Sequence, residues 1–338
     1  MPKKPALSIV VIAKNEEENI GYCLNSVVAE AKNFDSVEII LVDSRSSDRT
    51  VEIASKYDIK IAVMGKEHRV NPGLGRFIGS QLASGDFVFF IDGDTALCDG
   101  WLKEAMALVG RFDWIAGVTG NMEEGTIGKN GEFHQLRTLN SFSEPRYKDA
   151  IAVTTTMSGT TLFRKDILKK AGNFDPFMIT HEDTELLYRI QKKGYEVAWL
   201  PKTMGHHLTD TYSLKENITR FKTGYYVGAG QLLNRSIKGG FLRKGYKFMK
   251  HIINCFLVLF LGLVCCFISM YIKNLNFFFI WLAPVILMLV INLIKAKNIK
   301  VFVINMVRIF WLVLSFWAGI FLFPRPYDDK SWHYKIVK

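Results

Sequence analysis

Two aspartates follow directly on an apolar run in the stretch Val88–Leu97, VFFIDGDTAL. Carboxylates this close repel each other, and burying either one costs free energy unless a partner compensates its charge. Asp92 and Asp94 therefore either face water in a turn, as calcium loops also do, or hold a cation between them. Hard oxygen ligands of this kind suit Mg²⁺ or Mn²⁺, whose remaining coordination positions are commonly filled by water and diphosphate.

Further carboxylates stand where an element begins or ends. Asp43 ends the run VEIILVD and could accept a hydrogen bond from a base or a ribose; as a cap for the next helix it competes with Asp48. The triplet His181-Glu182-Asp183 opens a helical segment, where the helix dipole favours acidic side chains in any protein. Asp183 could also accept a proton from an incoming hydroxyl as a general base.

Two adjacent histidines follow the run YEVAWLPKTM. Imidazole suits Mn²⁺ less well than carboxylate does but is tolerated, so His206 is our candidate for a third metal ligand. His207 then packs, although the sequence alone does not decide between the two histidines.

The elements that must position these side chains alternate between strand and helix. Apolar runs within 7–13, 37–43, 59–64 and 86–92 have the buried, parallel-strand pattern, with helical segments between them. Such βαβ units build a parallel sheet, and ligands bind beyond the carboxyl ends of its strands. Asp43 and Asp92 should therefore share one crevice. We expect acidic residues in the first turn of the first helix, and a long loop over 123–156.

Charge is distributed unevenly over the 338 residues, whose net charge is +11. No Asp or Glu occurs from Asn217 to Tyr327, a stretch that carries fourteen Lys or Arg. Because this basic segment lies beside long apolar runs, it indicates an anionic membrane surface rather than nucleic acid. The five cysteines form no CxxC pair, which argues against a zinc or disulfide framework and for free thiols in a reducing compartment.

Apolar runs at 252–272 and 275–294 have the length of about 20 residues that spans a bilayer, and together they predict a tight membrane hairpin. A third run, 301–323, contains Arg308, so it either crosses or lies in the membrane interface. Basic residues flank the hairpin at 235–250 and 295–300, and we see no signal peptide. By the positive-inside rule, the part before the hairpin should lie on the cytoplasmic face. The tail after 323 then ends outside if the third run crosses, and inside if it does not.

Five segments resemble, in the same order, the family 2 glycosyltransferases of GT-A fold: SIVVIAKNEEENI, LVDSRSSDRT, GLGRFIGSQLASGDFVFFIDGDTAL, SGTTLFRKDILKKAGNFD and HEDTELLYRI. The resemblance covers roughly residues 7–207. It implies a Rossmann-like mixed sheet flanked by helices that binds a nucleotide-diphosphate sugar, followed here by a helical membrane region. We expect a catalytic domain at 1–225, a basic interfacial segment at 226–251, membrane helices at 252–323 and a polar tail at 324–338.

The resemblance also implies roles for single residues. Asp43 would contact the nucleobase, Asp92 the ribose and Asp94 the metal, and Asp183 would be the catalytic base. As one of the paired carboxylates, Asp92 is also a candidate metal ligand. The remaining implied residues are the nucleotide-binding end of the first strand, a cation near the diphosphate and neighbours of the base: Ala13, Asn15, Glu16, Arg76, His181 and Glu182. The metal would be Mn²⁺ or Mg²⁺.

The acceptor follows from the base. A sugar hydroxyl needs a general base, whereas a polyprenyl phosphate is already anionic at neutral pH. We therefore expect an inverting transfer to a hydroxyl of a lipid-linked or cell-surface glycan at the membrane, with no nucleic-acid partner. Two alternatives stay open: a polyprenyl-phosphate glycosyltransferase, and a catalytically silent nucleotide-sugar-binding membrane protein. The string QLLNRS departs from the Q-x-x-R-W element of processive synthases, which argues against processivity.

Overall fold

The computed structural model describes residues 6–128, 132–139, 146–208, 214–296, 298–321 and 332–338. The chain forms two compact units. The first unit comprises Met1–Thr211 together with Pro324–Lys338, and the second unit is the intervening segment Tyr212–Phe323. The second unit is thus an insertion between two parts of the first.

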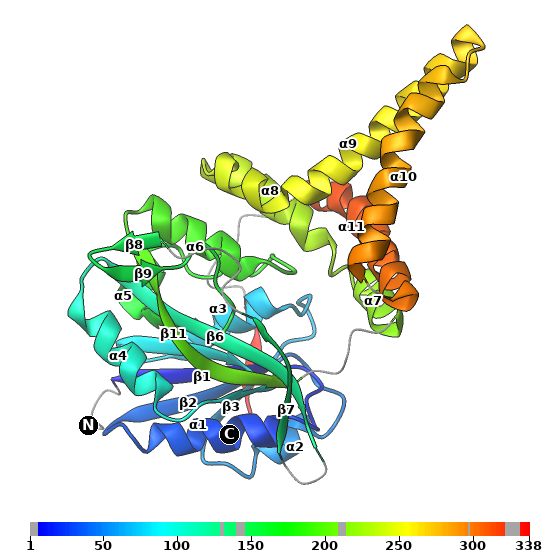
Figure 1. Ribbon diagram of the computed structural model, residues 1–338. Helices are drawn as coiled ribbons and strands as arrows, with labels where there is room; N and C mark the ends of the chain where they lie inside the picture. The colour runs from blue at the N-terminus through cyan, green and yellow to red at the C-terminus, as the bar shows by residue number, and fades with distance from the viewer. Residues whose placement is uncertain (1–5, 129–131, 140–145, 209–213, 297, 322–331) are drawn as a thin grey trace. The chain divides into compact units, whose positions relative to one another are not determined.

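The first unit is built on one mixed sheet (Figure 1). Strands β1, β2, β3 and β4 pair in parallel, while β10 runs antiparallel between β4 and β6. The strands are β1 (Leu7–Ala13), β2 (Val37–Asp43), β3 (Lys60–Met64), β4 (Phe87–Asp92), β5 (Thr95–Leu97), β6 (Ile115–Ile127), β7 (Phe133–Leu139), β8 (Arg146–Lys148), β9 (Ile151–Val153), β10 (Thr161–Arg164), β11 (Glu196–Leu208) and β12 (Tyr334–Ile336).

Helices cover the sheet on both faces: α1 (Ile20–Ala31), α2 (Thr50–Ala54), α3 (Pro72–Leu82), α4 (Trp101–Arg111), α5 (Lys165–Lys170) and α6 (Glu182–Lys192). One core lies between the sheet and α1 and α4, and a second lies on the α3 and α6 side. All seven residues of β1 are buried, which explains its uninterrupted apolar sequence. On the α3 side, Gly79 lets the helix approach closely, because a Cβ there would overlap the side chain of Val10.

Three features of the first unit differ from the expectations. Residues 123–156 are not one loop, because β6 continues to Ile127 and the strands β7, β8 and β9 follow. The acids Glu16, Glu17 and Glu18 precede α1 instead of forming its first turn. Finally, part of the expected polar tail forms β12, which pairs antiparallel with the edge strand β3.

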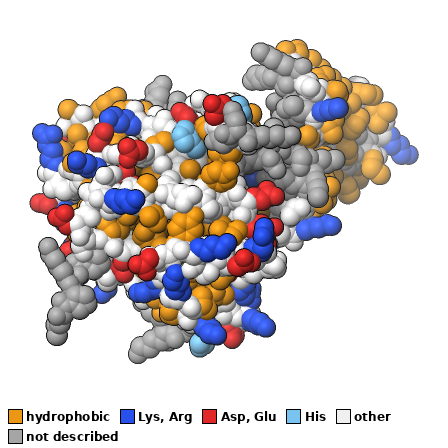
Figure 2. Space-filling view, turned by 90° about the horizontal axis from the view of Figure 1, so that it is seen from below, with side chains coloured by type: hydrophobic (Ala, Val, Ile, Leu, Met, Phe, Trp, Pro, Cys, Tyr) orange, Lys and Arg blue, Asp and Glu red, His pale blue; other side chains and the backbone are white. Residues whose placement is uncertain are grey.

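The second unit consists of helices α7 (Leu214–Lys222), α8 (Val227–Gly239), α9 (Leu242–Ile272), α10 (Asn276–Ala296) and α11 (Ile299–Phe321). Three of these, α9, α10 and α11, are long and apolar enough to cross a membrane. The expected run 252–272 forms the later part of α9, whose first turns carry the basic residues. Large apolar side chains stand exposed on these helices, where Figure 2 shows hydrophobic side chains gathered.

Candidate active site

Three parallel strands place carboxylates at one edge of the sheet. Ala13 at the end of β1 lies opposite Asp43 at the end of β2, and Ile12 lies opposite Asp92 at the end of β4. The strands therefore end at nearly the same level, and the turns that follow them share the space beyond this edge.

Asp43 is fully buried and holds the turn after β2. The backbone N–H and the hydroxyl of Ser46 donate to its two carboxylate oxygens at 2.9 and 2.5 Å. Burial raises the pKa of Asp43, although the bonds from Ser46 oppose the rise. Asp48 instead contacts the start of α2, where it accepts from the backbone N–H and the hydroxyl of Thr50. Asp48, and not Asp43, is therefore the acid that contacts the next helix.

The turn after β1 presents Asn15 and Glu16. Asn15 adopts a left-handed conformation with φ 57°, and its amide oxygen accepts from the backbone N–H of Ser47. The backbone N–H of Glu16 donates to the hydroxyl of Thr50, while the Glu16 carbonyl accepts from the first turn of α1. Burial, reinforced by the negative charge of Asp94, raises the pKa of Glu16 to about 7.

Arg76 links the carboxylates of β4 and α6. Its guanidinium lies 2.5 Å from Asp92 and 2.6 Å from Glu182, and it donates to the carbonyl of Gly159. The side chain is 3% exposed, and Gly159 leaves room for it, because a Cβ at that position would overlap the guanidinium. The role of Arg76 beside a diphosphate stays a prediction. In the structure its planar guanidinium binds two carboxylates and a carbonyl, and it thereby orients both acidic motifs.

The acids that open α6 have different surroundings. Glu182 is buried against Arg76, and burial raises its pKa to about 7 although Arg76 opposes the rise. Asp183 is partly exposed and accepts from the backbone N–H of Thr184 at 2.6 Å. Burial also raises the pKa of Asp183, which brings it closer to the range of a general base. His181 precedes them in a left-handed conformation, and burial lowers its pKa to about 4.

The structure places His207, not His206, against the aspartate pair. The Nε2 atom of His207 lies 3.1 Å from Asp94, and its Nδ1 atom lies 3.5 Å from Glu124. Burial alone would lower the pKa of His207, but the hydrogen bond with Asp94 and the nearby carboxylates raise it to about 9.

His206 points the other way, because neighbouring side chains of a strand lie on opposite faces. Its Nδ1 atom lies 3.3 Å from Glu123 and its ring packs 4.1 Å from the ring of Phe133. His207 rather than His206 therefore lies beside Asp94, and a metal-ligand role for either histidine stays a prediction. Strand alternation alone could not choose between the histidines, because it does not tell which face of β11 lies beside Asp94.

The described residues around this edge carry an excess of negative charge. Five carboxylates belong to the group: Glu16, Asp92, Asp94, Glu182 and Asp183. Their cations are Arg76 and His207, and the raised pKa values of four of the carboxylates reflect burial together with mutual repulsion. Adding a divalent cation beside Asp94 would offset this repulsion, and the carboxylate oxygens fit the preference of Mg²⁺ or Mn²⁺.

Sequence reasoning missed several of these contacts. It did not foresee the pairing of Arg76 with Glu182, the turn held by Ser46, or the approach of Glu123 and Glu124 to the two histidines. Glu123 and Glu124 belong to the segment that the sequence predicts as a loop, because the polar half of β6 lacks an apolar strand pattern. The Arg76 pairing spans 106 residues of sequence and has no local signal.

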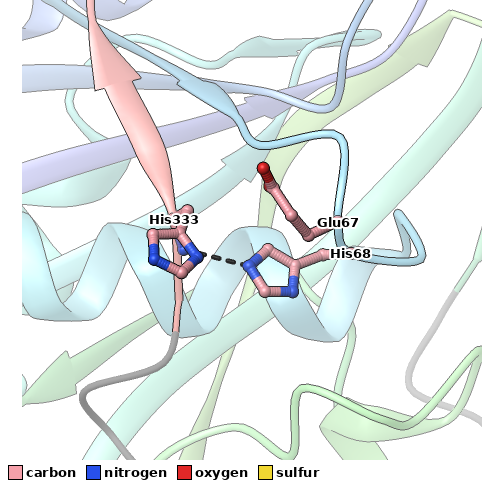
Figure 3. Close-up of side chains that lie close together, drawn as sticks. All are labelled: Glu67, His68 and His333. Atoms are coloured by element: carbon pink, nitrogen blue, oxygen red, sulfur yellow. Dashed lines mark hydrogen bonds between the residues drawn. The ribbon is translucent and has the colours of Figure 1, made fainter.

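A separate group of metal-ligating side chain types lies at the edge of the sheet where β12 pairs with β3 (Figure 3). Glu67, His68 and His333 offer ligand atoms within 4.8 Å of one another. The backbone N–H of His333 already donates to Nε2 of His68 at 3.0 Å, and Glu67 and His333 are exposed. We therefore interpret this group as a contact that holds β12 in place.

Comparison with known proteins assigns the class. The sequence profile of glycosyl transferase family 2 matches residues 8–172, which include Asp43, Arg76, Asp92 and Asp94 but not α6 or the two histidines. Residues 8–172 therefore form a domain that belongs to the family 2 glycosyltransferases.

This chain covers different shares of the length of its relatives. Glycosyltransferase AglE of Haloferax volcanii is 25% identical over 68% of this chain and 73% of its own length. Poly(ribitol-phosphate) beta-N-acetylglucosaminyltransferase TarS of Staphylococcus aureus is 31% identical over 62% of this chain but only 38% of its own length. Poly-beta-1,6-N-acetyl-D-glucosamine synthase of Staphylococcus epidermidis is 26% identical over 59% of this chain and 48% of its own length.

Among solved structures, the mannosyltransferase PcManGT of Pyrobaculum calidifontis resembles this chain with a TM-score of 0.57 at 15% identity. The alignment covers 95% of this chain and 88% of PcManGT. At this identity the likeness concerns the fold, and it confirms the expected GT-A architecture, a mixed sheet with flanking helices.

Proposed function

We propose that this chain is a membrane-anchored, inverting glycosyltransferase. It would move a sugar from a nucleotide-diphosphate donor to a hydroxyl of a lipid-linked or cell-surface glycan. The observation that carries the proposal is the meeting of acidic motifs from β2, β4 and α6 in a family 2 glycosyltransferase domain. Arg76 joins the motifs of β4 and α6.

The donor would bind along the ends of the parallel strands. Asp43 and the turn at Asn15 and Glu16 would face the nucleoside, and Asp92 the ribose. Asp94, flanked by His207 and with Asp92 nearby, would hold Mn²⁺ or Mg²⁺. Such an ion offsets the charge that develops on a leaving diphosphate. PcManGT was solved with GDP-mannose and Mn²⁺, which supports testing both the ion and this class of donor.

Asp183 would remove the proton of the acceptor hydroxyl. The bond from Thr184 leaves its second carboxylate oxygen available to a substrate, and its raised pKa improves it as a proton acceptor. The hydroxyl oxygen would then form a bond to the anomeric carbon while the bond to the diphosphate breaks on the opposite face, so the configuration inverts.

The membrane part of the proposal rests on α9 and α10, which would hold the domain on the cytoplasmic face beside the acceptor lipid. The basic residues at the start of α9 support this side, since positive flanks remain in the cytoplasm.

The test is a donor panel with Asp183→Asn. Detergent-purified protein is supplied with Mn²⁺ or Mg²⁺, with UDP-glucose, UDP-N-acetylglucosamine or GDP-mannose, and with lipid extract or polyprenyl phosphate. We expect transfer to the glycan-bearing lipid fraction and a loss of about 10²–10⁴-fold in kcat for the variant, with donor affinity preserved. Asp166→Asn, on the exposed surface of α5, is the matched control.

Each other outcome has a clear meaning. Near-normal transfer by Asp183→Asn would remove Asp183 from the role of base. Product formed from polyprenyl phosphate alone would favour the alternative acceptor, a lipid phosphate. Donor binding with neither hydrolysis nor transfer, across the panel, would favour a silent nucleotide-sugar-binding protein.

A further inference from the structure

The polypeptide leaves the first unit before α7 and returns to it after α11. β12 pairs with β3 in register from Tyr334 opposite Met64 to Ile336 opposite Ala62. The ring of Trp332 packs 5.9 Å from Phe77 of α3 and 5.5 Å from Phe177. The backbone N–H of Ile61 donates to the carbonyl of Lys338 at 2.8 Å. The tail is therefore part of the domain that carries the candidate active site.

This connection limits how the inserted helices can cross a membrane. A chain that starts and ends on the same side of a bilayer crosses it an even number of times. Three helices have the length and hydropathy to cross, so at least one of them cannot do so while β12 stays on β3.

Contacts within the second unit identify α11 as the exception. Helices α7 and α8 have 9 and 13 residues, too few for the roughly 20 that span a bilayer, and they carry Arg220, Lys222, Arg235 and Lys238. They precede α9 directly, so they lie on the side where α9 enters the membrane.

The C-terminal half of α11 packs along α7 and α8. The rings of Phe221 and Trp311 stack at 3.8 Å, and the amide of Asn234 donates to the carbonyl of Ile320 at 2.7 Å. Between these contacts, Gly230 and Gly319 bring the two backbones together, because a Cβ on either glycine would overlap the other helix. This half of α11 therefore lies at the level of α7 and α8. The other end of α11 begins three residues after α10, which by then has returned to the same side.

The surface of α11 fits a helix lying in the interface. Its exposed large apolar side chains recur at helical spacing and form one stripe: Ile299, Val303, Phe310, Leu314, Trp317 and Phe321. Arg308 is exposed and, at about 100° per residue, falls on the opposite side of the helix from this stripe. The stripe can enter the acyl chains while Arg308 reaches the headgroups, which removes the cost of an arginine at the bilayer centre.

We propose that α9 and α10 alone cross the bilayer and that α11 lies along the lipid surface on the side of the catalytic domain. This inference rests on the membrane anchoring proposed above, but not on the reaction. Helix α11 would then bind lipid on the side of the membrane that holds the active-site domain. In the sequence, α11 directly precedes the tail that returns to this domain.

Cysteine labelling in sealed membranes tests the topology. Three exposed positions are compared with an impermeant maleimide: Lys103→Cys on α4, Leu275→Cys at the hairpin tip, and Lys335→Cys on β12. The unsubstituted chain gives the background from the native thiols. We expect Lys335→Cys to react from the same side as Lys103→Cys, and Leu275→Cys only from the opposite side.

A second pair of variants reports the depth of α11. Arg308→Cys should react from the side of Lys103→Cys, whereas Leu263→Cys, exposed on α9, should lie within the bilayer and react from neither side. Labelling of Lys335→Cys with Leu275→Cys, or an unreactive Arg308→Cys, would overturn the inference while leaving the anchor intact. If all three surface positions report one side, the hairpin does not cross, and the inference fails together with the proposed anchoring, although sugar transfer can still be measured.

Discussion

Arg76 makes two ion pairs from a buried position. Their contribution to the free energy of unfolding depends on all three partners being present. Removing the guanidinium leaves Asp92 and Glu182 facing each other without compensation. Breaking the buried Arg76–Glu182 pair is far more costly than losing an exposed one, because the carboxylate of Glu182 stays out of water, whereas the side chain of Asp92 is 36% exposed.

We therefore expect Arg76→Met to lower the free energy of unfolding by about 3–5 kcal/mol and to weaken donor binding. Arg49→Met is the control, since the Arg49–Glu17 pair is largely exposed and should contribute about 0–1 kcal/mol. Urea unfolding followed by fluorescence gives both values. Equal losses for the two variants would contradict the special role of the buried pair.

Glu16 gives the fold a pH dependence. Its pKa rises from 4.5 to about 7 in the folded protein, so the folded state binds more protons than the unfolded state between these values. The free energy of unfolding should therefore fall as pH rises from 4.5 to 7. His207 acts with the same sign in a higher window, between 6.5 and about 9.

In EDTA, we expect Glu16→Gln to remove on the order of 1–3 kcal/mol of this fall between pH 5 and pH 7.5. Thermal unfolding across this range measures it. Adding Mn²⁺ to the unsubstituted protein should also flatten the dependence, because a divalent cation competes with the protons. A variant that keeps the full slope would assign the effect to other carboxylates.

At the scale of elements, successive side chains of β11 point to opposite faces of the sheet, so two adjacent histidines have different surroundings. His207 meets Asp94 because β11 pairs antiparallel with β5, which begins one residue after that aspartate. His206 turns to Glu123, Cys98 and Phe133 on the other face.

His207→Ala should raise the Mn²⁺ concentration for half-maximal transfer about 10–100-fold, as expected when a group next to a metal ligand is lost. His206→Ala should change it less than about threefold, because its contacts lie away from Asp94. The measurement is a metal titration of the transfer rate at fixed pH. Equal shifts in the two variants would contradict the assignment by strand face.

The parallel half of the sheet and the three long apolar helices could be predicted from the sequence, because buried strands and membrane-type helices are uninterrupted apolar runs. Asp43 and Asp92 were placed together for the same reason, since both end such runs. The polar half of β6 and the strands β7 to β9 could not be predicted, because their stability depends on partners across the sheet. The three-residue strand β12 likewise depends on β3 and has no pattern of its own.

At the scale of the whole molecule, the tail stabilises the domain to which it returns. Trp332 fills a site beside Phe77 and Phe177, and the β12 ladder covers the edge of β3. Both contacts join residues more than 150 positions apart in the sequence, so each must offset the entropy cost of closing a long loop.

We expect Trp332→Ala to lower the free energy of unfolding by about 1–3 kcal/mol, less than a fully buried tryptophan because the side chain is partly exposed. Lys335→Ala, exposed on the same strand, is the control and should change it by less than about 0.5 kcal/mol. Urea unfolding in detergent separates the two. A neutral Trp332→Ala would mean that the tail contributes little to the domain.

The return of the tail also fixes an order of events during synthesis. Strand β3 is made early, yet its neighbour β12 emerges only after all the apolar helices have been translated. Until then the open edge of β3 can pair with strands of other chains, as unprotected edges do. Ribosomes that stall or terminate before residue 332 would release a domain with an uncovered edge, whereas complete synthesis closes it. Strand β12 thus makes the domain's resistance to aggregation depend on the translation of the inserted helical unit.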